Sequence, residues 1–153
     1  MNNYFKPAYM GWFYNPKTFW GNIIATIDWL KHLRQRAFRG WADCDSWEIA
    51  SYLTEIMPPM LNRLKRDSHG YPGWGQASTS EKWDALLDKI IEGFEAGKRV
   101  NNDDYYMSTN ADILTRKPAK EEVLSWSEAS KVDKKIFNDN MKVFIKWFFH
   151  LWD

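Results

Sequence analysis

The sequence predicts an all-α protein, a compact bundle of four to five helices with a long C-terminal helix. Apolar residues recur at spacings of three and four along much of the 153-residue chain, as they do on one face of an α-helix. Capping residues and glycines separate these segments. Nowhere does an alternating run of β-branched residues extend far enough to indicate a strand. Because chains of this length usually form one core, we expect a single helical domain over 1–153.

The first helix is expected to begin at Asn15-Pro16, since asparagine is a good N-cap and proline is tolerated in the first turn. Gly40 is placed to end this helix as its C′ residue. The basic side chains near its end form either a solvated terminus that complements the helix dipole or an anion-binding patch. The apolar positions are Phe19, Trp20, Ile23, Ile24, Ile27, Leu30 and Phe38, and the basic ones are Lys31, His32, Arg34, Arg36 and Arg39.

A second helix is expected to start at Asp45, because Asp45 and Glu48 have the cap-to-N3 spacing of a capping box. Pro58-Pro59 predicts a kink or a break, since each proline removes a backbone hydrogen bond and clashes with the preceding turn. Glycines and a proline then mark residues 66–75 as a loop. The apolar positions of this helix are Trp47, Ala50, Leu53, Ile56, Met57, Met60, Leu61 and Leu64.

The third helix has the clearest signature. Ser78 and Glu81 fit a capping box, and apolar residues from Trp83 to Phe94 follow in steps of three and one. We expect Gly97 to end this helix and residues 100–109 to form a polar connector. The last helix is expected from about Pro118 to Leu151. Its apolar face is wide enough for a central helix and contains Val132, Ile136, Phe137, Met141, Phe144, Trp147, Phe148 and Leu151.

The composition and the net charge exclude several classes of function. One cysteine excludes an internal disulfide framework and a cysteine-based zinc site, and we predict neither a metal nor a cofactor. The start of the chain lacks the pattern of a signal peptide, and no apolar run is long enough to span a membrane. The net charge of +1 provides no field that draws the protein to nucleic acid or to a membrane. We therefore expect neither sequence-specific DNA binding nor membrane attachment.

Aromatic residues are unusually abundant, at 17 % of the chain with ten tryptophans. They fit either a bulky core or a binding surface, where stacking on a planar ligand contributes about 1–3 kcal/mol per base. Several lie at helix ends or in loops, where binding groups concentrate. If these segments meet, the aromatic rings could hold a nucleobase while the arginines contact a phosphate. The candidate ligand-binding residues are Arg36, Arg39, Trp41, Asp43, Trp47, His69, Tyr71 and Trp74.

The stretch RGWADCDSWEIASYL also has a purely structural interpretation. Asp45 caps a helix, and Cys44 is a small buried residue. Asp43, Asp45 and His69 could supply metal ligands, but their spacing is not diagnostic. His69 with Asp43 could transfer protons, although no nucleophile accompanies them. No catalytic residue is predicted.

Several motifs occur in a fixed order: NPKTFW, RGWADCDSWEIASYL, the proline of IMPPMLNRL, SHGYP, EKWDALLDKIIEGFEAG and FFHLWD. With these motifs in this order, the chain resembles a family of small uncharacterised proteins encoded by bacteriophages and prophages. The resemblance covers roughly residues 15–97 and 141–153. The family has no established activity, so the resemblance transfers no catalytic residue. It implies a protein that acts in the cytoplasm of an infected bacterial host.

In that context the leading hypothesis is a non-enzymatic counter-defence protein that sequesters a nucleotide-type immune signal in an aromatic and arginine pocket. A second hypothesis is a protein–protein inhibitor of a host defence effector, with exposed Trp and Tyr as anchors. A virion or assembly component and a hydrolase are the others. The expected partners are thus a small nucleotide-like ligand or a host defence protein, with a homo-oligomer as a further expectation.

Overall fold

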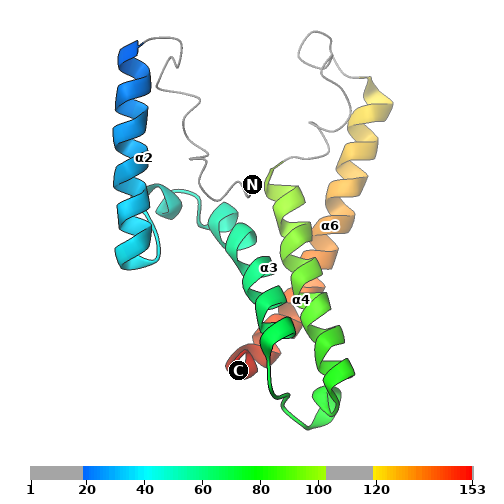
Figure 1. Cartoon of the computed structure of the whole chain (residues 1–153). Helices are drawn as coiled ribbons and strands as arrows, with labels where there is room; N and C mark the ends of the chain where they lie inside the picture. Colours follow the sequence, from blue (N-terminus) through cyan, green and yellow to red (C-terminus); the bar gives the residue numbers. More distant parts are fainter. Residues whose placement is uncertain (1–18, 103–118, 153) are drawn as a thin grey trace. The chain divides into compact units, whose positions relative to one another are not determined.

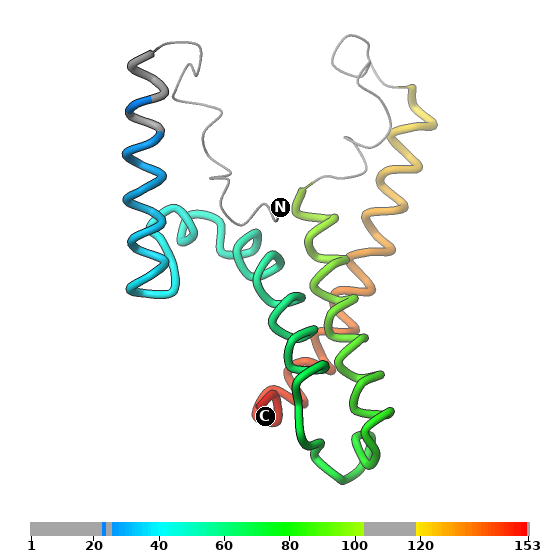
Figure 2. Tube along the Cα trace, in the orientation of Figure 1, coloured from blue at the N-terminus to red at the C-terminus, as the bar shows by residue number. Residues whose placement is uncertain are grey.

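The computed structural model describes residues 19–102 and 119–152, and these are helical with short connections (Figures 1 and 2). This part of the chain contains no strand, which confirms the all-α class. It also contains no helix long and apolar enough to cross a membrane. The 28-residue helix Lys120–Trp147 confirms the predicted long C-terminal helix. Asn15-Pro16 and most of the expected connector lie outside the described residues. The α-helices are α2 (Phe19–Arg39), α3 (Ile49–Asp67), α4 (Ser80–Asn101) and α6 (Lys120–Trp147), and the 3-10 helices are η2 (Asp43–Ser46), η3 (Gly75–Ala77) and η5 (Phe148–His150).

The chain divides into two compact units, with the boundary after Tyr52, near the start of α3. The first unit contains α2 and η2. The second contains most of α3 together with η3, α4, α6 and η5. The expected single domain stays a prediction, and each unit is described by itself.

In the first unit, α2 ends where the sequence predicts. Gly40 adopts φ = +79°, a conformation that strains residues with a Cβ atom, and its N–H donates to the Arg36 carbonyl at 2.9 Å. The apolar face predicted for α2 is not buried at three of its positions, because Ile27, Leu30 and Phe38 are all exposed. The periodicity therefore identifies a helix here but not a buried face.

The predicted start of α3 is wrong. The helix begins at Ile49, whereas Asp45 lies in the preceding η2. The Asp45 carboxylate accepts the Ala42 N–H at 2.7 Å and forms an ion pair with Arg36. The first interaction is with the residue that precedes η2 and the second is with α2, so this side chain is not available to cap the start of α3.

Of the kink or break predicted at Pro58-Pro59, the break does not occur, since α3 is continuous from Ile49 to Asp67; the kink stays a prediction. The two prolines cannot donate to the carbonyls one turn earlier. Tertiary packing offsets this loss, because Pro58 and Leu61 are both buried. The Asn62 amide also donates to the Pro58 carbonyl at 3.0 Å.

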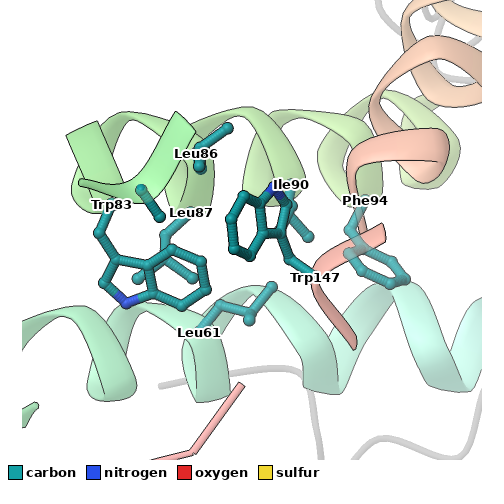
Figure 3. Close-up of a cluster of buried hydrophobic side chains, with 8 residues drawn as sticks. Leu61, Trp83, Leu86, Leu87, Ile90, Phe94 and Trp147 are labelled. Atoms are coloured by element: carbon teal, nitrogen blue, oxygen red, sulfur yellow. The ribbon is translucent and has the colours of Figure 1, made fainter. Parts of the chain in front are cut away.

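The core of the second unit is built mainly on α4 (Figure 3). Most of the apolar residues predicted for this helix are buried, and Ile91 is half-buried, which confirms the periodicity. Its N-cap is Thr79, one residue later than predicted, and the Thr79 hydroxyl accepts the Lys82 N–H. α4, not α6, is thus the central helix of this unit. The core cluster consists of Leu61, Ala77, Trp83, Leu86, Leu87, Ile90, Phe94 and Trp147.

Gly97 does not end α4, which continues to Asn101. A Cβ atom at Gly97 would lie 2.7 Å from the Phe137 ring, and one at Gly93 would lie 2.8 Å from Asn140 Cβ. Such distances are far shorter than normal contacts between carbon atoms. The two glycines, one helical turn apart, therefore allow α6 to approach α4 closely.

Replacing Gly93 by alanine is expected to destabilise the second unit by about 1 kcal/mol, the difference between a packing cost and a smaller gain in helix propensity. Alanine improves helix propensity by about 1 kcal/mol, but the added Cβ overpacks the α4–α6 contact at a cost of about 1–3 kcal/mol. Urea unfolding followed by circular dichroism measures the difference. Gly70→Ala is the matched control, because nothing lies within 4 Å of a Cβ atom at that position. Equal stability of the two variants would contradict the close approach.

Ion pairs join α4 to its neighbours. The Arg99 guanidinium donates two hydrogen bonds, of 2.8 and 2.7 Å, to the buried carboxylate of Asp133 on α6. On the α3 side, Lys98 pairs with Glu55 at 3.1 Å. The first pair fixes the register of α4 against α6, because its two parallel bonds require a defined orientation.

Candidate functional site

The two aspartates of the ADCD stretch are both held by side chains of α2. Asp45 receives hydrogen bonds from Arg36, with an Nε–Oδ2 distance of 3.0 Å, and only 8 % of its side chain is exposed. Burial alone would raise the pKa of Asp45, but the hydrogen bonds from Arg36 and the Ala42 N–H outweigh this effect, so its pKa is lowered. Asp45 is therefore a charged anchor for η2.

Asp43 forms the second attachment of η2 to α2. Its carboxylate accepts from the Arg39 guanidinium and from the Gln35 amide, each at 2.6 Å. The Asp43 N–H donates in turn to the Gln35 side-chain oxygen at 2.9 Å. The hydrogen bonds from Arg39 and then Gln35 lower the pKa of Asp43. Both aspartates thus have a structural explanation.

Cys44 lies between them as a half-buried thiol, not the buried one predicted. Burial, and then the negative charge of Asp45, raise the pKa of Cys44. A thiol in this environment is protonated at neutral pH and is a poor nucleophile or metal ligand. Within the described ranges, no group of three His, Cys, Asp or Glu side chains could hold a metal ion.

The same attachment positions an exposed aromatic side chain. The Arg39 guanidinium carbon lies 4.2 Å from the centroid of the Trp41 ring, and the ion pair with Asp43 holds it there at 2.6 Å. Trp41 is 43 % exposed, and Phe38 and Trp47 are 81 % and 71 % exposed. We refer to residues 38–47 as the Trp41 segment. It presents three large aromatic rings within ten residues of one unit.

The other predicted ligand-binding residues belong to the second unit. His69 and Tyr71 are exposed in the connection after α3. The Trp74 ring packs against Trp147 and His150, with centroid distances of 4.9 and 5.5 Å. The structure thus brings Arg39, Trp41 and Asp43 together in one unit, and Trp74 into an aromatic cluster in the other. A joint pocket of all eight residues stays a prediction.

Sequence reasoning missed His150 and the exposed C-terminal aromatics. His150 packs on Trp147 as well as on Trp74. Phe149 and Trp152 do not fall on the apolar face predicted for the last helix, and they are 85 % and 69 % exposed. Two aromatic residues outside the predicted apolar face were the sequence feature that could have identified this exposed group.

Comparison with family models, with curated proteins and with solved structures gives no match to this chain. Membership of the phage family therefore stays a prediction that rests on the motifs.

Proposed function

We propose that this chain is a non-enzymatic phage protein that inhibits a host protein by binding it through the Trp41 segment. The observation that carries the proposal is the fixed geometry of Arg39 over Trp41, with Trp47 and Phe38 exposed nearby in the sequence. Trp and Arg are the side chains most enriched at the energetic centres of protein interfaces. Because the Asp43 ion pair already orders Arg39, less conformational entropy is lost when a partner binds.

The charges of the Trp41 segment indicate what kind of surface it fits. Arg39 is offset by Asp43, and Arg36 by Asp45. The two arginine–aspartate pairs therefore carry little net charge. Beside them the Trp41 segment presents aromatic rings that have polar groups at their edges. Such a surface suits an apolar pocket that is rimmed by hydrogen-bond acceptors, more than it suits a strongly acidic partner. The phage context supports a host defence effector as that partner.

Sequestration of a nucleotide signal is the competing proposal. It assigned Arg36 and Arg39 to a phosphate, and each guanidinium is engaged by an aspartate. A phosphate would have to displace those carboxylates. This requirement favours protein binding over sequestration.

Capture of the partner from infected-host cells tests the proposal. Tagged wild-type protein is expected to retain one host protein at near-stoichiometric ratio after cross-linking and mass spectrometry. Trp41→Ala and Trp47→Ala are expected to reduce its recovery at least about tenfold, since such anchors typically contribute 2 kcal/mol or more. Leu124→Ala is the control, because Leu124 is also exposed but lies on α6.

Two results would overturn the proposal. One is recovery of the same proteins by wild type and both tryptophan variants. The other is release of a stoichiometric nucleotide when the purified protein is heated, which mass spectrometry of the supernatant would detect. The second result would establish sequestration instead.

A further inference from the structure

The C-terminal end of the second unit exposes an unusual number of large apolar side chains. Phe148, Phe149 and Trp152 are 52 %, 85 % and 69 % exposed, and Ile145 on the last turn of α6 is 71 % exposed. The two phenylalanine rings contact each other edge to face, with centroids 5.4 Å apart. These four residues lie within eight positions of the chain and in the same unit.

A groove of about 430 Å³ lies beside this end of the chain, between the second half of α3 and the C-terminal residues. An apolar cavity of about 150 Å³ is enough to hold a benzene molecule. The groove is therefore large enough for an aromatic side chain. Its lining residues include both members of the Arg63–Asp67 ion pair, whose N–O distance is 2.8 Å. The apolar part of the lining consists of Met57, Met60, Leu61, Leu64, Leu151 and Trp152.

We propose that a second copy of this chain covers this face, in a two-fold dimer in which Phe149 of each copy enters the groove of the other. A two-fold interface uses the same patch on both copies, so the patch must be complementary to itself. Here the exposed aromatic residues and the groove belong to the same end of the chain, because Trp152 lines the groove and follows Phe149 by three residues. We refer to Ile145, Phe148, Phe149, Trp152 and the groove as the C-terminal face.

The exposed area is of the size that a dimer needs. Aromatic side chains bury about 150–250 Å² each, so at these exposures the three C-terminal aromatics offer about 300–500 Å². Ile145 and Met60 add to this area, since they are 71 % and 61 % exposed. The total approaches the roughly 800 Å² per partner of a standard interface. Patches on monomeric proteins rarely exceed about 300–600 Å².

The charges of the face are also complementary to themselves. Arg63 and Asp67 have opposite signs and both line the groove. Asp67 is paired with Arg63 and with Arg66 in each copy. In a two-fold arrangement the Arg63–Asp67 pairs of the two copies can lie antiparallel, so that each Arg63 keeps its own Asp67 and faces that of the other copy, with no like charges opposed. The net charge of +1 adds almost no repulsion between copies. This inference does not depend on the proposed function, which uses the other unit.

Sedimentation velocity of the full chain at increasing concentration tests the dimer. The wild type is expected to shift from monomer to dimer, and Phe149→Ser and Trp152→Ser are expected to weaken the association at least about tenfold. Trp47→Ser is the control, because Trp47 is as exposed as Trp152 but lies in the first unit. Circular dichroism verifies that each variant stays helical.

A charge exchange separates this dimer from non-specific association. Arg63→Glu alone is expected to weaken the dimer, and Arg63→Glu combined with Asp67→Lys to restore it, because the double variant again pairs opposite charges. A wild type that stays monomeric at every concentration would overturn the proposal. So would a dimer that the Phe149 and Trp152 variants form as strongly as the wild type does.

Discussion

Replacing Trp147 by alanine is expected to destabilise the second unit by about 3–5 kcal/mol, the usual cost of removing a large aromatic side chain from a core. Trp147 is fully buried. Its ring contacts Trp83 and Trp74 with centroid distances of 5.7 and 4.9 Å. Trp147 belongs to one core cluster with residues of α3, η3 and α4, so no single neighbour is expected to fill the cavity left by the indole. Urea unfolding followed by far-ultraviolet circular dichroism measures the loss.

Two further variants show whether packing causes this loss. Trp147→Phe keeps a ring in the core and removes the indole N–H, which has no hydrogen-bond partner among the described residues. It is expected to cost much less than alanine. Trp47→Ala, at a tryptophan that is 71 % exposed, is expected to change the free energy of unfolding by less than about 1 kcal/mol. A cost of Trp147→Ala no larger than that of Trp47→Ala would contradict the packing of Trp147 in the core.

The second large effect is expected at Asp45, where alanine should destabilise the attachment of η2 to α2 by about 2–5 kcal/mol. The variant loses charge-assisted hydrogen bonds with Arg36, at about 1.5–3 kcal/mol. It also loses the bond to the Ala42 N–H, comparable to a helix cap at about 0.5–2 kcal/mol. Amide hydrogen exchange of residues 40–47 reports this local stability. Asp43→Ala is the control, because its carboxylate is 50 % exposed and should contribute less.

The pH dependence of the same exchange identifies the group responsible. The folded state lowers the pKa of Asp45 below its ordinary value of 3.8. Its contribution is therefore complete above about pH 4 and is lost as the pH falls through the folded-state pKa. Protection factors of residues 40–47 should fall more steeply below pH 4 in the wild type than in Asp45→Ala, which keeps only the smaller contribution of Asp43, whose pKa is also lowered. The same acid profile in both proteins would assign the stability to another group.

The sequence alone predicts the structure where it depends on the backbone preference of a single residue or on local spacing. Gly40 ends α2 because the required positive φ is a local property, and the helical segments follow from the spacing of their apolar residues. The association of Arg39, Trp41 and Asp43 was also within reach, since they lie within five positions of one another. The sequence analysis assigned Arg39 to a phosphate, whereas Asp43, four positions later, forms an ion pair with it and changes the chemistry expected of the site.

The wrong predictions concern residues whose local structure depends on contacts with residues distant in the sequence. Asp45 has the spacing of a helix cap, but Arg36, nine positions earlier, competes for its carboxylate. Gly97 has the position of a helix end, but Phe137 requires a small residue there within a continuing helix. Pro58-Pro59 suggests a break, but burial of Pro58 keeps α3 intact. In each case the local preference is about 1–3 kcal/mol, and a single tertiary contact can exceed it.

The close contact between α4 and α6 has a consequence for how this sequence can diverge. Space at positions 93 and 97 is shared with Asn140, Met141 and Phe137 across the contact. A larger residue on α4 is tolerated only if a smaller one appears on α6, as when Gly97→Ala is accompanied by Phe137→Leu. The two sides must therefore change as pairs. Among diverged copies of this chain, position 97 should covary with 137, and position 93 with 140 and 141.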